Sequence, residues 1–372
     1  MRIVLFCHSL ISDWNHGNAH FLRGILRELQ VRGHDVRVYE PRDAWSMANM
    51  LRDIGPGAIT GFRRAFPTLS STRYGLATFD EEEALDGADL VLVHEWNEPA
   101  LVARIGKHHA RGGHYALLFH DTHHRSMSDP AALARFDLTR YDGVLAFGDV
   151  IRECYLACGW GRRAWTWHEA ADVRTFAPLQ GIERTSDLVW IGNWGDEERS
   201  AEIRDYLIRP VREMRLSARV YGVRYPVDAR QELRDADIVY GGWLPNYRAP
   251  EVFAQHRVTV HVPRRPYVES LPGIPTIRVF EALACAIPLV SAYWDDRENL
   301  FTPGVDYLVA RTPGEMAKHL REVLMDEALA ASLATHGLET IRQRHTCAHR
   351  VDELLEIAAT VRGATTEKEL TV

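Results

Sequence analysis

Short apolar stretches and amphipathic stretches alternate from the start of the chain. Residues 2–8 (RIVLFCH) are a β-branched apolar run, which is typical of a buried strand. Residues 18–33 repeat apolar positions every three to four residues and end at a glycine, which predicts a helix. Residues 34–41 return to a strand pattern. The order strand, helix, strand predicts a βαβ unit with parallel strands.

The same alternation continues through the first half of the chain. The further candidates are strands over 88–95, 114–121 and 142–148, and helices over 98–113 and 148–159. Such a series predicts a mostly parallel sheet wrapped by helices. We therefore expect an N-terminal Rossmann-like domain over residues 1–170.

Residues 171–184 follow neither the strand period nor the helix period, and they contain a proline and a glycine. We interpret this segment as a linker. Strand and helix signals then resume, so we expect a second Rossmann-like domain over residues 185–345. Residues 346–363 predict a C-terminal amphipathic helix that can cross back to the first domain, and residues 364–372 are expected to be a tail.

Two doubly wound α/β domains in succession predict a central cleft between them. Ligands of open α/β sheets bind beyond the carboxyl ends of the strands, and here two sets of strand ends would face each other. This arrangement indicates either two ligands or one ligand enclosed by a hinge motion.

The composition limits the classes of protein to which this chain can belong. Of the 372 residues, 46% are hydrophobic and 26% are charged, which suits a globular chain with a sizeable core. The net charge of -7 argues against a nucleic-acid partner. No apolar run is long enough for a transmembrane helix, although peripheral membrane contact stays open. The five cysteines are few and odd in number, so we expect reduced thiols and a cytoplasmic location.

The segment TIRVFEALACAIPLVS, residues 276–291, combines a buried helix face with two charges. Thr276 is a suitable N-cap after a turn with a glycine and a proline. An exposed helix N-terminus there attracts anions, because its N–H groups and the helix dipole favour negative charge. Two interpretations of Arg278 and Glu281 stay open. They can flank a diphosphate and a ribose, or form a surface ion pair worth roughly 0.2–0.5 kcal/mol.

Residues 278–291 (RVFEALACAIPLVS) resemble the donor-binding helix of the group 1 glycosyltransferases of the GT-B fold, whose pattern is E-A-x-A-x-G-x-P-x-[VI]-[SA]. The surrounding sequence agrees. Residues 187–193 (DLVWIGN) resemble the first strand and turn of the family's C-terminal domain, 239–263 its following strand and helix progression, and 168–178 (HEAADVRTFAP) its linker. The resemblance covers the C-terminal half and is loose over the first hundred residues. The nearest branch is the spore-protein (CgeB-like) glycosyltransferases.

The resemblance implies a GT-B fold, with two Rossmann-like doubly wound domains facing a central cleft. It implies that a sugar moves from a nucleotide diphosphate sugar donor to an acceptor that the sequence does not identify. It also implies retention of the anomeric configuration, and a reaction without metal or other cofactor, since helix dipoles and basic side chains take the place of the metal.

Roles for individual residues follow from the same resemblance. Glu281 would bind the ribose, and the turn from Thr276 through Ile277 to Arg278 would hold the diphosphate. Arg224 would stabilise charge on the leaving group. The remaining candidate donor contacts are Asn193, Arg199, Trp243 and Leu244. Two of these have a structural alternative, since Trp243 can be a core residue and Arg199 a solvated helix residue.

Two segments of the N-terminal half carry candidate chemistry. His120 matches the family's histidine near the reaction centre, and Asp121 would be a general base in an inverting enzyme or would orient His120 in a retaining one. With His123 and His124 these residues are also potential metal ligands, but we expect no metal site. Gly17 and Asn18 would let the backbone approach the diphosphate or the acceptor, or would simply start the helix. 

The chain departs from the family pattern at two positions. The family's second glutamate falls at Gly273, and the usual glycine near the helix end is Ala286. The first departure removes the usual contact to the donor sugar. It therefore keeps two alternatives open: a non-catalytic nucleotide-sugar-binding relative and a nucleotide-sugar epimerase on the same fold. A DNA-modifying glycosyltransferase would need a basic tract that this acidic chain lacks.

Overall fold

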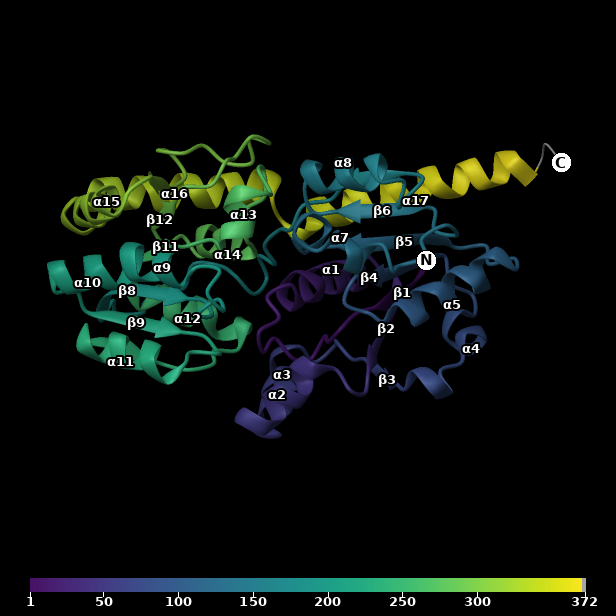
Figure 1. Ribbon diagram of the computed structural model, residues 1–372, viewed down its shortest axis with the longest axis horizontal. Helices are drawn as coiled ribbons and strands as arrows, with labels where there is room; N and C mark the ends of the chain where they lie inside the picture. The colour runs from purple at the N-terminus through teal and green to yellow at the C-terminus, as the bar shows by residue number, and fades with distance from the viewer. Residues whose placement is uncertain (370–372) are drawn as a thin grey trace. The chain divides into compact units, whose positions relative to one another are not determined.

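The structure, a computed structural model, describes residues 1–369, with side chains described as far as residue 363. The chain forms two compact units. Unit 1 contains Met1–Glu169 and the segment that begins at Cys347, and unit 2 contains Ala170–Thr346. Each unit is built on one parallel sheet surrounded by helices, as Figure 1 shows. The predicted pair of doubly wound α/β folds is thereby confirmed.

The sheet of unit 1 has seven strands in the order β3-β2-β1-β4-β5-β6-β7. The strands are β1 (Arg2–Phe6), β2 (Asp35–Pro41), β3 (Thr72–Tyr74), β4 (Leu90–His94), β5 (Ala116–Asp121), β6 (Gly143–Ala146) and β7 (Ala164–Thr166). All neighbouring strands are parallel, so their carboxyl ends share one edge. The strand order reverses between β1 and β4, which is where ligands bind in such sheets.

Helices connect these strands, as a parallel sheet requires. They are α1 (Ala19–Val31), α2 (Trp45–Asp53), α3 (Gly57–Ala65), η1 (Leu76–Thr78), α4 (Glu81–Leu85), α5 (Pro99–Ala110), α6 (Arg125–Ser128), α7 (Pro130–Leu133) and α8 (Asp149–Ala157). Helix α1 buries Leu22, Ile25 and Leu29 at successive turns, which is the apolar stripe expected from its sequence.

The C-terminal helix α17 (Cys347–Glu369) packs against α1 in unit 1, where it is coloured yellow in Figure 1. Arg32, the C-cap residue of α1, donates to the Ala348 carbonyl oxygen over 3.0 Å, and Trp167 Nε1 donates to the Arg350 carbonyl oxygen over 2.8 Å. The helix runs past the predicted end at residue 363. The expected tail is therefore helical as far as Glu369, and residues 370–372 lie outside the described residues.

The sheet of unit 2 has six parallel strands in the order β10-β9-β8-β11-β12-β13. The strands are β8 (Ser186–Ile191), β9 (Ala218–Tyr221), β10 (Ile238–Tyr240), β11 (His256–His261), β12 (Leu289–Ala292) and β13 (Leu308–Ala310). The helices are α9 (Ser200–Ile203), the π-helical turn η2 (Arg204–Ile208), α10 (Arg209–Met214), α11 (Val227–Asp235), η3 (Asn246–Arg248), α12 (Ala249–Ala254), α13 (Arg265–Glu269), α14 (Ile277–Ala284), α15 (Pro313–Met325) and α16 (Glu327–Arg344).

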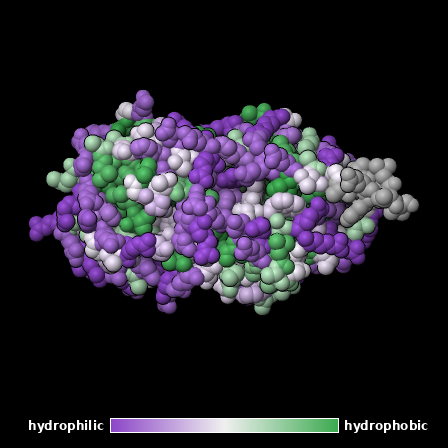
Figure 2. Space-filling view, turned by 90° about the horizontal axis from the view of Figure 1, so that it is seen from above, coloured by the Kyte–Doolittle hydropathy of each residue, from purple (hydrophilic) through white to green (hydrophobic). Residues whose placement is uncertain are grey.

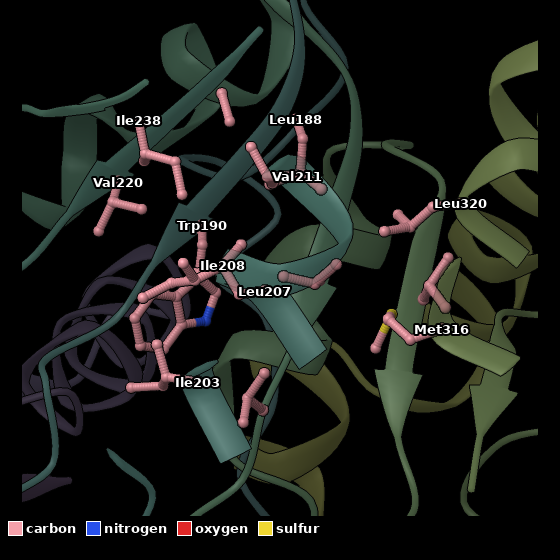
Figure 3. Packing of buried hydrophobic residues seen from close by; sticks show 14 of the residues in the cluster. Leu188, Trp190, Ile203, Leu207, Ile208, Val211, Val220, Ile238, Met316 and Leu320 are labelled. Carbon is pink, nitrogen blue, oxygen red and sulfur yellow. The ribbon is translucent and has the colours of Figure 1, made fainter. Parts of the chain in front are cut away.

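Trp190 of β8 lies at the centre of the core of unit 2. Figure 3 shows its indole ring among Ile203, Leu207 and Ile208, which come from the helical segment that follows β8. Met316 and Leu320 of α15 belong to the same buried cluster. Burial of side chains this large holds the helices on the sheet, at roughly 25 cal/mol per Å² of apolar surface removed from water.

The surface in Figure 2 is mostly hydrophilic, with apolar residues in scattered spots. Within the part of the chain that the structure describes, no helix combines the length and the apolar character needed to cross a membrane.

Helix α14 is fixed by close contact with α16, which permits a stability prediction. A Cβ added at Gly337 of α16 would lie 2.7 Å from Leu283 Cδ2 and 2.9 Å from the Asp306 carbonyl oxygen. We expect Gly337→Ala to lower the free energy of unfolding by about 1–3 kcal/mol through overpacking, although alanine favours helices by about 1 kcal/mol. Urea denaturation followed by circular dichroism measures the effect. Gly314→Ala in α15 is the control, because its Cβ would meet only Thr312 Oγ1 at 3.9 Å. An unchanged or higher stability of Gly337→Ala would contradict the prediction.

Candidate functional site

The start of α14 is tied to the sheet of unit 2 by His261, the last residue of β11. Thr276 Oγ1 lies 3.0 Å from His261 Nε2, and Ser291 Oγ lies 2.8 Å from His261 Nδ1. Ser291 donates its own hydroxyl proton to the Ala292 carbonyl oxygen, so it accepts from His261, and His261 accepts from Thr276. Burial lowers the pKa of His261 to about 3, which keeps the ring neutral.

This arrangement corrects the predicted role of Thr276. Thr276 is the N-cap residue of α14, but its side chain caps no backbone N–H group of the helix. The hydroxyl group is directed to His261 instead. In the first turn of α14, Val279 donates its N–H group to the Thr276 carbonyl oxygen at 3.0 Å. The N–H groups of Ile277 and Arg278 stay for another partner, which is the condition for an anion site at a helix N-terminus.

Arg278 and Glu281 form the predicted i, i+3 ion pair, through Arg278 Nη1 and Glu281 Oε2. The alternative of a surface ion pair is wrong, because the Glu281 side chain is 0% exposed and that of Arg278 is 18% exposed. Removing one partner of a buried pair leaves the other charge uncompensated and costs about 3–5 kcal/mol. The pair is therefore part of the interior of unit 2.

Arg199 is also an interior anchor and not the solvated helix residue of the alternative interpretation. Its guanidinium group donates to the Asn193 carbonyl oxygen at 2.7 Å and to the Val262 carbonyl oxygen at 3.1 Å, and it lies 5.1 Å from the centre of the Trp190 ring. Burial, followed by the positive charge of Arg264, lowers the pKa of Arg199 to about 9. The group stays protonated at neutral pH.

Three arginines thus carry positive charge near the carboxyl ends of β8 and β11. Arg264 is paired with Glu198 at 2.7 Å, and the charges of both Arg264 and Arg278 act on Arg199. Like charges gathered in this way favour an anionic ligand, because it would relieve their mutual repulsion. Arg264 and His261 were not predicted from the sequence, although the run HVPRRP, which starts at the last residue of a strand, carried the signal.

Two loops of unit 2 position the other predicted donor contacts. Asn193 Oδ1 accepts from the Val223 backbone N–H at 2.8 Å, which joins the end of β8 to the end of β9. Arg224 has a left-handed backbone (φ 61°) and pairs with Asp196 at 3.1 Å. Trp243 and Leu244, which follow β10, are both half-buried.

Gly273, where the family carries its second glutamate, has φ 95°, a conformation that glycine adopts without strain. Its N–H group donates to the Asp295 carbonyl oxygen at 2.6 Å. A Cβ at this position would lie 2.4 Å from Glu298 Oε1. The turn before α14 therefore has a carboxylate beside it, supplied by the segment between β12 and β13.

In unit 1, the loop between β1 and α1 holds Gly17 and Asn18. Arg23 fixes this loop from inside, donating to the Leu10 and Ile11 carbonyl oxygens at 2.8 Å each and pairing with Asp13 at 2.9 Å. Asn18 Nδ2 donates to Glu169 Oε1 at 3.0 Å, and Gly17 is exposed.

His120 and Asp121, at the end of β5, are both 0% exposed. Neither ring nitrogen of His120 has a hydrogen-bond partner among the described residues, so the expected orientation of His120 by Asp121 is wrong. Asp121 accepts instead from the His123 N–H group at 3.0 Å and from Tyr155 Oη at 2.9 Å. Burial, followed by the charge of Glu95, raises the pKa of Asp121 well above its ordinary value.

No group of three or more His, Cys, Asp or Glu side chains within the described part of the chain is arranged to hold a metal ion. The potential ligand set of His120, Asp121, His123 and His124 is therefore not assembled as one site. His123 and His124 instead have their rings 4.0 Å apart.

The raised pKa of Asp121 makes stability depend on pH. The folded protein retains this proton above pH 4, where the unfolded chain releases it, so stability falls as pH rises. We expect Asp121→Asn to make the decline between pH 5 and pH 8 shallower, by up to about 1.4 kcal/mol per pH unit. Urea denaturation across this range measures the slope.

Asp137→Asn is the control for this experiment. Thr139 holds the pKa of Asp137 below its ordinary value, so this carboxyl group titrates below the window. Equal slopes for Asp121→Asn and the wild type would show that Asp121 ionises without penalty.

Comparison with known proteins places this geometry in context. Residues 201–356 match the family model described as glycosyl transferase-like. No curated protein sequence matches the chain significantly.

Solved structures are similar over nearly the whole chain. Sucrose-phosphate synthase from Thermosynechococcus elongatus is 12% identical with a TM-score of 0.66, covering 98% of this chain and 100% of that one. Anabaena Alr3699/HepE in complex with UDP and glucose is 14% identical with a TM-score of 0.68, covering 97% and 100%. An alpha-glucosyltransferase in complex with UDP-glucose and DNA is 14% identical with a TM-score of 0.70, covering 96% and 99%. The fold is therefore GT-B, as the resemblance implied, whereas the CgeB-like branch stays a prediction.

Proposed function

We propose that the protein is a glycosyltransferase that moves a sugar from a nucleotide diphosphate sugar to an acceptor. The observation that carries the proposal is the uncapped start of α14, with Arg199, Arg264 and Arg278 close by. A diphosphate matches this chemistry, since it accepts hydrogen bonds from backbone N–H groups and needs several positive charges. The UDP complexes of the similar structures and the glycosyl transferase-like match of residues 201–356 support the same assignment.

Donor binding would break the Arg278–Glu281 ion pair and give each of the two side chains a new partner. Glu281 is buried and paired with Arg278 in the structure. A diphosphate at the start of α14 competes for the Arg278 guanidinium group, because Arg binds phosphate oxygens as well as carboxylates. Glu281 is then available to accept hydrogen bonds from the ribose hydroxyl groups.

The same cations would stabilise the reaction. Negative charge builds up on the diphosphate as the bond to the sugar breaks, and preorganised positive charge lowers the free energy of that state. His261 supports this arrangement by holding Thr276 while staying neutral, so it adds no further repulsion to the arginines. In this proposal the donor needs no metal ion and no cofactor, and Arg224 assists the leaving group.

A thermal-shift screen tests donor binding. UDP is the first probe, followed by GDP, TDP, CDP and ADP. A nucleotide at a hundredfold over its dissociation constant stabilises the folded protein by about 2.7 kcal/mol. We expect stabilisation of the wild type, and a smaller one for Glu281→Gln, in which a neutral amide replaces the carboxylate.

Glu251→Gln is the matched control, because Arg248 and Glu251 are an exposed i, i+3 pair in the same unit, 3.1 Å apart. It should respond to nucleotide like the wild type. The proposal is abandoned if no nucleotide stabilises the wild type, and the role of Glu281 fails if both variants keep the full shift.

We further propose that the anomeric configuration is retained. An inverting reaction needs a general base, and Asp121 is unsuited to that role because both of its carboxyl oxygens already accept hydrogen bonds, from the His123 N–H group and from Tyr155 Oη. In a retaining reaction, the departing diphosphate oxygen accepts the proton of the attacking hydroxyl group. This group attacks the anomeric carbon from the side that the diphosphate leaves.

Proton NMR of slow donor hydrolysis tests the stereochemistry. From an α-linked donor we expect the α anomer of the free sugar to form first and then to mutarotate. Initial formation of the β anomer would mean inversion and would require a base other than Asp121.

A further inference from the structure

A second cluster of functional groups lies in unit 1, at the carboxyl edge of its sheet. Trp45, Trp96 and His123 are half-buried and stand edge to face, with ring centres 6.2 Å apart for Trp45 and Trp96 and 5.1 Å apart for Trp96 and His123. They come from the start of α2 and from the segments that follow β4 and β5. We call these three rings the aromatic platform.

Four buried imidazole rings, the imidazole row, continue inward from the platform. His8 lies 4.6 Å from the Trp45 ring and 5.5 Å from His16. His16 lies 6.4 Å from His94, which lies 5.1 Å from His120. The row thus crosses the ends of β1, β4 and β5, on both sides of the point where the strand order reverses.

The imidazole row is uncharged at neutral pH. Burial lowers the pKa of His8 to about 4 and that of His120 to about 3, and it lowers those of His16 and His94 well below the ordinary value. A neutral imidazole offers one N–H donor and one nitrogen acceptor. Hydroxyl groups both donate and accept, so they can use both nitrogens of such rings, whereas an anion can use only the N–H donor and a cation only the nitrogen acceptor.

Part of this hydrogen-bonding capacity is unused. His8 Nε2 accepts from the Ser46 N–H group at 3.3 Å, and His94 Nε2 lies 3.0 Å from Thr122 Oγ1. In contrast, His16 Nε2 and both nitrogens of His120 have no partner among the described residues. Native proteins leave few buried polar atoms unsatisfied, since each costs about 1–3 kcal/mol. The three unsatisfied nitrogens of the imidazole row therefore indicate that hydrogen-bonding atoms of a ligand complete this part of unit 1.

We propose that the aromatic platform and the imidazole row form a binding site for a neutral saccharide, which is the acceptor of the transferred sugar. The apolar face of the saccharide ring packs on Trp45 and Trp96, and its hydroxyl groups exchange hydrogen bonds with the imidazole row. The identity of this ligand as acceptor rests on the proposed glycosyltransferase function.

Other ligand classes match the site less well. A cationic ligand would be repelled by the Arg125 guanidinium group, which already lies 4.2 Å from the centre of the Trp96 ring. A nucleic acid would also stack its bases on tryptophan, but its phosphates need cations. Arg125 is paired with Glu95, and carboxylates flank the cluster, with the Asp43 charge acting on His8 and Asp53 accepting from Trp14 Nε1 at 3.1 Å.

Saturation-transfer-difference NMR tests the site directly, without any turnover. The probes are methyl α-glucoside, methyl α-mannoside, methyl β-galactoside, methyl β-N-acetylglucosaminide, maltose and cellobiose, with inositol phosphate and a short DNA duplex as charged comparisons. We expect at least one glycoside to show saturation of its ring protons, because the method detects millimolar affinities. Trp45→Ala and Trp96→Ala should each reduce this signal at least tenfold.

Trp165→Ala is the matched control. Trp165 is a half-buried tryptophan of the same unit with an arginine, Arg163, 5.6 Å from its ring centre, but it lies on the edge strand β7. This variant should keep the saccharide signal. Circular dichroism and the nucleotide thermal shift of every variant show whether it is folded.

The outcomes separate this inference from the proposed function. A nucleotide shift with no glycoside signal, or with a signal that survives both Trp45→Ala and Trp96→Ala, overturns the saccharide site and leaves the transferase proposal standing. A glycoside signal without any nucleotide shift overturns the transferase, and with it the role of the saccharide as acceptor. Binding of the duplex in place of the glycosides also overturns the inference.

Discussion

The donor site proposed for unit 2 depends on the hydrogen bond between Thr276 and His261. Because the Thr276 hydroxyl group is directed to His261, the side chain of Thr276 does not cap the N–H groups of Ile277 and Arg278 in the first turn of α14. Because His261 is buried and neutral, it can sit beside Arg199 and Arg278 without adding a further positive charge. One buried imidazole thus joins β11, β12 and α14 and leaves the helix N-terminus open to an anion.

The two clusters use the same position in their sheets and opposite chemistry. Both lie at the carboxyl ends of parallel strands, where the chain leaves the sheet and loops can present side chains. In unit 2 these positions carry arginines and a helix N-terminus, which suit a charged diphosphate. In unit 1 they carry neutral imidazoles and tryptophans, which suit an uncharged ligand. A transferase needs this division, since its donor has a charged leaving group and its acceptor contributes a hydroxyl group.

The sequence predicted what depends on local spacing. The strands, most of the helices, the two-unit α/β fold and the Arg278–Glu281 pair all follow from periodicity or from i, i+3 geometry. The sequence did not predict that Glu281 is buried or that Thr276 bonds to His261. Those facts depend on contacts between residues fifteen or more positions apart. The imidazole row was missed for the same reason, since its four histidines come from the loop after β1 and from the ends of β4 and β5, and only His120 followed a recognised pattern.

Gly273 shows how far a motif can mislead when it is taken alone. The family's acid is absent from that position, and a side chain there would be strained at φ 95°. Yet Glu298 places its carboxylate against Gly273, from a segment twenty-five residues later in the chain. A carboxylate acts through its position and its surroundings, whichever residue supplies it. The motif lacks its glutamate, but the turn still has an acid beside it. Gly273 by itself therefore does not favour a non-catalytic relative.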